Sequence, residues 1–288
     1  MTVINNRGVS AIESAFERGK ILIPYLVAGF PDEKSSLECM KAAFNAGADM
    51  LEIGVPFSDP IADGAVIQHA QDKALRNGMT LRKTLRLAAD LAADLAADLA
   101  ADLAADLAAD LAADQKKTVS KPLILMCYYN PILHFGIERF VDSALESGVD
   151  GVIVPDLVPD EAELLIESAR KKNFATVFLA APNSSEKRLR LISKSSSGFI
   201  YALGLEGVTG ERDKMSDKLS TFVENIRSID KSENKKAHRV GIGFGVSKPE
   251  HFKMLSAIAD GVIVGSAVVR RAESSPQAVR EFIEELRR

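Results

Sequence analysis

The stretch LEIGVPFSDPIADG, residues 51–64, joins the end of an apolar strand to a loop rich in Pro, Ser and Asp. Glu52 interrupts the apolar run, and Asp63 follows eleven residues later. Acidic side chains are almost never fully buried unless something compensates them. A Glu near the end of a buried strand, facing an Asp on the following loop, is therefore a candidate acid–base pair. A buried Glu paired with an Arg or Lys inside a barrel is the structural alternative, and the spacing alone does not decide between the two.

Around this stretch, short apolar runs recur along the chain, and helical patterns lie between them. The runs are residues 21–28, 50–55, 123–128, 151–155, 175–180, 198–203, 240–243 and 261–265. Near-continuous apolar strands alternating with helices indicate a parallel sheet covered on both faces. Eight such units predict the α/β class and one (β/α)8 TIM-barrel domain over residues 1–288, with its chemistry on loops at the C-terminal ends of the strands. A short helix over residues 9–18 would plug the bottom of this barrel or flank it.

A repeat interrupts the regular spacing after the second strand. Residues 87–114 are seven copies of Leu-Ala-Ala-Asp, which strongly favours helix. A period of four drifts against 3.6 residues per turn, so the leucines spiral around the helix and form no single stripe. We expect an insertion in the second crossover helix, between strands 2 and 3, without chemistry of its own. A helix over residues 81–116 leaves only six residues for the return to strand 3, so the tract must form a helical hairpin, fray near its end or slide along the barrel.

The amino-acid composition of the chain argues against several classes of function. The 288 residues are 47% hydrophobic, which allows a large core, and the net charge of −4 argues against a nucleic-acid partner. The four histidines show no metal-ligand spacing, so we expect no metal. Cys39 and Cys127 lie far apart in apolar stretches and favour reduced core thiols. Because no signal peptide opens the chain and no run is long enough to span a membrane, we expect a cytoplasmic protein without a membrane partner.

Two glycine-rich segments follow the last two strands. Gly241-Ile242-Gly243-Phe244-Gly245 ends strand seven, and Gly265-Ser266 opens a helix after strand eight. Glycine lets backbone N–H groups approach an anion, and a helix N-terminus adds favourable partial charge. Either segment alone could be a tight turn. Together, at the two loops where barrel enzymes frequently bind phosphate, they predict a phosphorylated substrate.

The sequence of residues 51–64 closely resembles the signature of the tryptophan synthase α family. The resemblance runs from about Phe16 to the C-terminus, outside the repeat, and includes Tyr128-Tyr129-Asn130-Pro131 and Gly207-Val208-Thr209-Gly210. It implies a lyase of tryptophan biosynthesis that cleaves indole-3-glycerol phosphate to indole and glyceraldehyde 3-phosphate in a retro-aldol reaction. By resemblance Glu52 shuttles the protons, with a pKa raised by its apolar strand, and Asp63 accepts a hydrogen bond from the indole N–H.

The resemblance also assigns residues that bind the substrate. Thr209 would orient Asp63, and backbone groups of Gly210, Gly245, Gly265 and Ser266 would hold the phosphate. Pocket-lining positions fall on Tyr25, Tyr128, Tyr201 and Phe244, for which filling the barrel core is the alternative. Before Gly207 the family usually has Ser-Arg-x, whereas this chain has Gly204-Leu205-Glu206, a departure that bears on loop closure.

The family works as an α2β2 complex and passes indole to a β subunit that carries pyridoxal phosphate. The resemblance therefore implies a β-subunit partner and no cofactor on this chain. Two alternatives stay open: a free-standing lyase that releases indole, and a weakly active scaffold or activator of the β subunit. High activity without a partner would select the first, whereas the intact Glu52 and Asp63 argue against the second.

Overall fold

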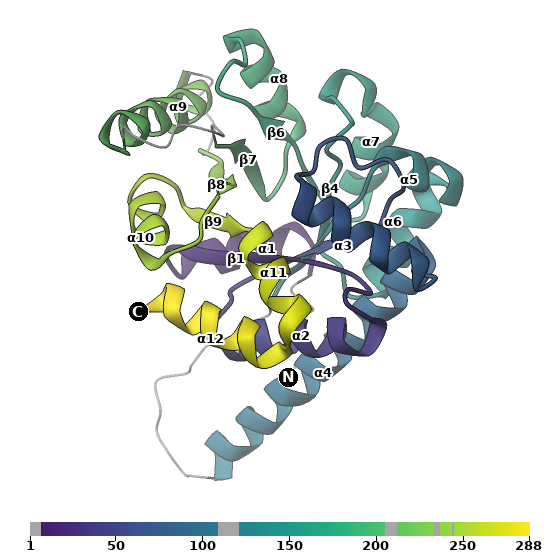
Figure 1. Cartoon of the computed structure of the whole chain (residues 1–288). Coiled ribbons are helices and arrows are strands. Elements are labelled where there is room, and N and C mark those ends of the chain that lie inside the picture. The colour runs from purple at the N-terminus through teal and green to yellow at the C-terminus, as the bar shows by residue number, and fades with distance from the viewer. Residues whose placement is uncertain (1–6, 109–120, 205–211, 233–236, 244) are drawn as a thin grey trace.

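The structure is a computed structural model that describes residues 7–108, 121–204, 212–232, 237–243 and 245–288. Within these ranges, parallel strands form one sheet in the order β5-β4-β3-β2-β1-β9-β8-β7-β6, which curls into a nearly closed barrel (Figure 1). The strands are β1 (Ile21–Val27), β2 (Leu51–Gly54), β3 (Leu123–Met126), β4 (Gly151–Ile153), β5 (Ala175–Val177), β6 (Leu179–Ala180), β7 (Phe199–Leu203), β8 (Arg239–Gly243) and β9 (Gly261–Val264). The predicted TIM-barrel class is confirmed.

The fifth predicted strand differs from the expectation because it is divided at Phe178. Its first half, β5, pairs with β4, and its second half, β6, pairs with β7. At the break the Phe178 carbonyl accepts the Tyr201 N–H at 3.1 Å, and the Phe178 ring packs in the outer core. The chain changes partner strand at this residue, so eight predicted strands become nine segments.

Helices cover the outside of the barrel and follow the strands in alternation (Figure 1). Those that the structure describes are α1 (Val9–Glu17), α2 (Glu33–Asn45), α3 (Ala65–Arg76), α4 (Leu81–Ala108), α5 (Tyr129–Phe135), α6 (Ile137–Glu146), the 3-10 helix η1 (Pro159–Glu161), α7 (Glu163–Lys171), α8 (Glu186–Ser195), α9 (Arg212–Ser232), α10 (Pro249–Ile258), α11 (Ser266–Ser274) and α12 (Pro276–Arg287). None of these helices is long and apolar enough to cross a membrane.

A separate apolar cluster fills the inside of the barrel. Met50, Ile124 and Phe199 belong to it, together with Phe16 from α1. The rings of Phe16 and Phe199 lie 5.5 Å apart, so α1 closes the N-terminal end of the barrel. Of the two placements expected for this helix, plugging the bottom of the barrel or flanking it, the first is the one observed. Chemistry inside the barrel is therefore confined to the other end, where the strands finish.

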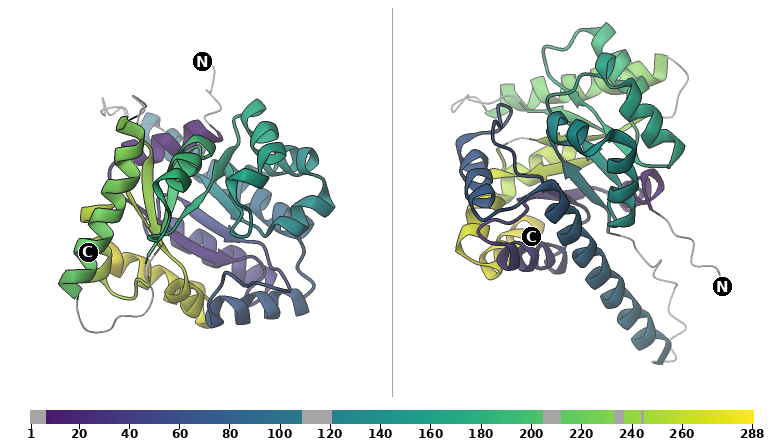
Figure 2. Two further views of the ribbon diagram at one scale, coloured as in Figure 1. Left: turned by 90° about the horizontal axis from the view of Figure 1, so that it is seen from above. Right: turned by 90° about the vertical axis from the view of Figure 1, so that its right-hand side faces the viewer.

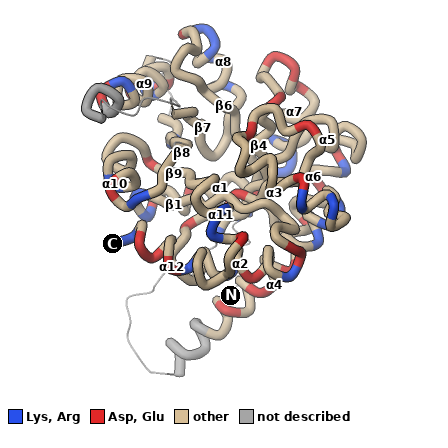
Figure 3. Tube along the Cα trace, viewed as in Figure 1, with Lys and Arg blue, Asp and Glu red and all other residues tan. Residues whose placement is uncertain are grey.

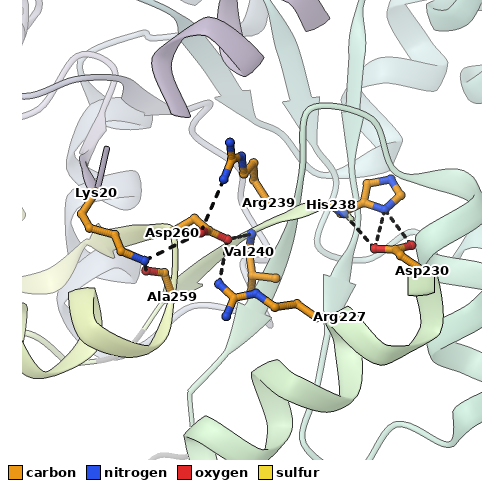
Figure 4. A network of polar contacts seen from close by, with 8 residues as sticks. All are labelled: Lys20, Arg227, Asp230, His238, Arg239, Val240, Ala259 and Asp260. Atoms are coloured by element: carbon orange, nitrogen blue, oxygen red, sulfur yellow. Dashed lines mark hydrogen bonds and ion pairs between the residues drawn. The ribbon is translucent and has the colours of Figure 1, made fainter. Parts of the chain in front are cut away.

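A polar network fastens the same N-terminal end (Figure 4). Asp260, just before β9, accepts the Val240 N–H at 3.0 Å and a hydrogen bond from the Arg227 guanidinium at 2.9 Å. Lys20, just before β1, lies 3.7 Å from the same carboxylate, and Arg239 lies 3.9 Å from it. The carboxylate thus joins α9 to the starts of three neighbouring strands.

The repeat tract continues helix α4 past the barrel. α4 is unbroken from Leu81 to Ala108, and one face of it is buried as far as Leu91. A Cβ on Gly148 would lie 2.6 Å from the Ala92 Cβ, so α4 passes directly over the turn before β4. After Leu95, which is partly buried, no side chain of residues 96–101 is buried. Figure 2 (right) shows the helix running away from the barrel, and Figure 3 shows acidic positions recurring along it. Residues 109–120, with the expected return, lie outside the described residues.

Candidate active site

Glu52 points into the C-terminal end of the barrel. Side chains alternate along a strand, so Glu52 shares the inward face of β2 with Met50 of the interior cluster. It is 1% exposed, and neither of its carboxylate oxygens has a hydrogen-bond partner among the described residues. Burial raises the pKa of Glu52 to about 8, with a smaller contribution from the charge of Asp63. Most Glu52 side chains therefore carry a proton at neutral pH, and no Arg or Lys of the described chain pairs with it.

Asp63 lies in a different environment on the loop after β2. Its Oδ2 accepts a hydrogen bond from the Tyr128 hydroxyl at 2.9 Å and another from the Gln71 side-chain amide at 2.7 Å. Burial raises the pKa of Asp63, whereas the hydrogen bonds from Tyr128 and Gln71 lower it. The two carboxylates thus differ in the way acid–base pairs do: in the part of the chain that the structure describes, Glu52 has no hydrogen-bond partner, whereas Asp63 is held by two donors.

Two tyrosines reach this region because glycines on neighbouring strands leave room for them. A Cβ on Gly54 would lie 2.2 Å from the Tyr25 hydroxyl oxygen, and a Cβ on Gly243 would lie 2.3 Å from that of Tyr201. Burial raises the pKa of both phenols, and the charges of Glu52 and Asp63 raise it further. Both phenols therefore stay protonated close to the carboxylate pair and form part of the wall around it.

The predicted phosphate loop after β9 borders the same wall. Gly265 precedes α11, which begins at Ser266, and the first N–H groups of a helix have no acceptor within it. A Cβ on Gly265 would lie 3.6 Å from the nearest atom of Ile67 and 3.8 Å from Tyr25. A Cβ on Gly245 would have no atom of a described residue within 4 Å. Both positions therefore offer open backbone at the end of the barrel where Glu52 lies.

The structure brings together five of the site residues predicted from the sequence. Glu52, Asp63, Tyr25, Tyr128 and Tyr201 form one cluster, as their mutual effects on pKa indicate. Thr209, Gly210 and Phe244 lie outside the described residues. Within the described part of the chain, no three His, Cys, Asp or Glu side chains lie where they could hold a metal ion.

Gln71 is the residue of this site that the sequence reasoning missed. It is 1% exposed and lies on the buried face of α3 with Ala70 and Ala74. Its side-chain oxygen accepts the Phe57 N–H at 3.0 Å. A buried amide on an otherwise apolar helix face, eight residues after a candidate carboxylate, was the available signal.

Comparison with known proteins agrees with this geometry. The family model described as "Tryptophan synthase alpha chain" matches residues 13–98 and 94–288. The chain belongs to the tryptophan synthase alpha chain family. It is 35% identical over 281 residues to the tryptophan synthase alpha chain of Dehalococcoides mccartyi, covering 97% of this chain and 98% of that one. With the alpha chain of Thermococcus kodakarensis it shares 40% identity over 275 residues, covering 94% of this chain and 97% of the other.

A solved tryptophan synthase structure shares the fold. It is a ligand-free form from M. tuberculosis, which superposes with a TM-score of 0.78 at 28% identity and covers 96% of each chain. As a member of the tryptophan synthase alpha chain family, the chain is a lyase of tryptophan biosynthesis that cleaves indole-3-glycerol phosphate.

Proposed function

We propose that Glu52 and Asp63 carry out the cleavage of indole-3-glycerol phosphate in this chain. The observation that carries the proposal is the contrast between the two carboxylates. Glu52 is buried, has no hydrogen bond to any described residue and has a pKa of about 8, while Asp63 is held by two neutral donors. Pairs of carboxylates with such different environments are typical of sites that need one acid and one anion.

The reaction uses the protonated form of Glu52 first and its ionised form second. Protonated Glu52 donates its proton to C3 of the indole, which creates an indolenine cation. The Asp63 carboxylate accepts a hydrogen bond from the indole N–H and stabilises that positive charge. The Glu52 carboxylate then takes the proton of the glycerol hydroxyl next to the bond that breaks. As the aldehyde forms, the electrons of the carbon–carbon bond return to C3, indole is released and Glu52 is protonated again.

The substrate phosphate would bind at the loops that contain Gly245, Gly265 and Ser266, with Gly210 completing the set. At Gly265 the surroundings predict a graded response. Gly265→Ala adds one carbon at ordinary contact distance from Ile67 and Tyr25, so we expect little change. Gly265→Val adds two more carbons beside the same neighbours, so we expect KM for indole-3-glycerol phosphate to rise at least tenfold because the backbone N–H groups become hard to approach. Steady-state kinetics measures both variants.

The alanine variant is the control for this prediction, and thermal unfolding shows whether either change harms the fold. A valine variant that discriminates between phosphorylated and unphosphorylated substrate as strongly as the parent would contradict the assignment of the phosphate to this loop.

We propose the β subunit of tryptophan synthase as the partner, with pyridoxal phosphate on that subunit only, and a cytoplasmic location. The partner would bind the C-terminal face of the barrel. Support comes from large apolar side chains exposed on segments after β2, β3 and β4, where Ile61 is 84% exposed, Leu133 49% and Val158 44%. Apolar groups gathered at one face commonly mark a protein interface.

The proposed function is tested by indole release from indole-3-glycerol phosphate, with and without a tryptophan synthase β subunit. We expect slow release by the chain alone and faster release with the partner. Equal, high rates in both arms would favour a free-standing lyase, and no release in either arm would overturn the proposal. A variant without residues 99–114 keeps the repeat residues that pack on the barrel. We expect unchanged release from it, and a loss of β-subunit activation would favour the scaffold alternative.

A further inference from the structure

We infer that Gln71 is a positioning residue that holds Asp63 in the orientation and charge state the cleavage needs. The inference rests on the proposed function of Asp63 and names a residue that acts through it. Gln71 would touch no substrate, because its side chain is 1% exposed and both ends of its amide contact protein groups on the loop after β2.

The direction of the Gln71 amide is fixed by its neighbours. An amide has one accepting oxygen and one donating nitrogen, and a flip exchanges their places. The Phe57 N–H can only donate, so it holds the amide oxygen on its own side at 3.0 Å. The nitrogen must therefore face Asp63, where it lies 2.7 Å from Oδ2. Because Gln71 is 1% exposed, water does not compete for either contact.

The same carboxylate oxygen receives the second donor. The Tyr128 hydroxyl accepts the Ala62 N–H at 3.0 Å, so its own proton is directed to Asp63 Oδ2 at 2.9 Å. Among the described residues Oδ1 has no hydrogen bond, and in the proposed mechanism it is the oxygen that accepts the indole N–H. Tyr128 also stacks on Phe57, with ring centroids 4.8 Å apart, so both donors are attached to one loop segment.

Two donors on one oxygen favour the ionised form of a buried carboxylate. Burial already raises the pKa of Asp63 on balance, although the two donors lower it. Without the Gln71 donor the pKa would rise further, and Asp63 would take up a proton at higher pH. A protonated Asp63 cannot stabilise the indolenine cation as an anion does. Gln71 therefore supports the chemical step more than substrate binding, and its removal affects kcat more than KM.

The experiment compares Gln71→Met with Gln68→Met in the full chain with its β subunit. Methionine is unbranched and of similar length but cannot donate. Gln68 is one turn earlier on α3, is exposed, and donates to the backbone carbonyl of Asp63 at 2.8 Å, so it holds the same loop without touching the carboxylate. The measurements are kcat and KM for indole-3-glycerol phosphate from pH 5 to 9, with thermal unfolding of each variant.

For Gln71→Met we expect kcat to fall about 10- to 100-fold, the worth of one hydrogen bond to a charged group, with a smaller change in KM. The acid limb of kcat/KM should move to higher pH by about one unit. For Gln68→Met we expect kcat within about threefold of the parent and an unmoved acid limb. Tyr128→Phe, which removes the other donor to Oδ2, should shift the acid limb in the same direction as Gln71→Met.

Gln71→Glu is the second test variant, to be used if Gln71→Met does not fold. It keeps an acceptor for the Phe57 N–H, loses the donor and adds a like charge, so the acid limb should move further up. An unmoved acid limb in both Gln71 variants, or an equal shift in Gln68→Met, would overturn the inference. Failure of the proposed function is a separate result, because the parent chain would then release no indole at any pH.

Discussion

Replacement of Glu52 by Gln is expected to reduce kcat for indole-3-glycerol phosphate cleavage by about 10²- to 10⁴-fold, the usual worth of a positioned acid–base group. The amide has nearly the same shape but can neither give a proton to C3 nor take one from the glycerol hydroxyl. KM should change far less, because in the proposed mechanism Glu52 moves protons while the loops that contain Gly245 and Gly265 hold the phosphate. The measurement is indole release at saturating substrate.

Asp150→Asn is the matched control for this prediction. Asp150 is also fully buried, but it lies before β4 at the opposite end of the barrel and accepts the N–H groups of Gly8 at 2.6 Å and Leu123 at 2.9 Å. The same carboxylate-to-amide change there should lower stability and leave kcat of the folded enzyme intact. Near-normal turnover in Glu52→Gln would remove Glu52 from the mechanism.

The same Glu52→Gln variant should become more stable than the parent as pH rises. In the parent the pKa of Glu52 is about 8 in the folded state and near its ordinary 4.5 when unfolded. Below pH 4.5 both states are protonated, so this group adds no pH dependence. Between 4.5 and 8 the unfolded chain releases the proton that the folded chain retains, so the free energy of unfolding of the parent falls. An amide does not titrate, so residue 52 of the variant adds no pH dependence to its free energy of unfolding.

The difference between variant and parent should therefore grow from about pH 4.5 to pH 8, by on the order of a few kcal/mol, and then level off. Urea unfolding at pH 5 and at pH 8 measures it. A difference that is the same at both pH values would show that Glu52 does not titrate in this window, and with it the acid role of Glu52 would lose its basis.

The sequence predicted the barrel and the carboxylate pair because both depend on local patterns. Runs such as residues 21–28 and 261–265 show their burial through composition alone, and Glu52 is conspicuous inside such a run. The division of the fifth strand at Phe178 was not predictable in this way. It follows from which strand each half meets, and that depends on how the barrel closes.

Contacts that cross between strands or helices explain the other differences. The space for Tyr25 over Gly54 exists only in the register that pairs β1 with β2. The role of Gln71 needs the loop after β2 to fold back onto α3, and the sequence offered only a polar residue on an apolar face. Thr209, Gly210 and Phe244 stay predictions because they lie outside the described residues.

The projecting part of α4 changes how the molecule moves in solution. Its first turns are packed on the barrel as far as Leu95, and no Gly or Pro interrupts the helix between Leu81 and Ala108. The thirteen residues from 96 to 108 therefore extend as an arm of about 20 Å at the usual rise per residue. Such an arm sweeps through solvent whenever the barrel turns. The 31.0 kDa chain thus experiences more rotational friction than a sphere of its mass and tumbles more slowly and anisotropically.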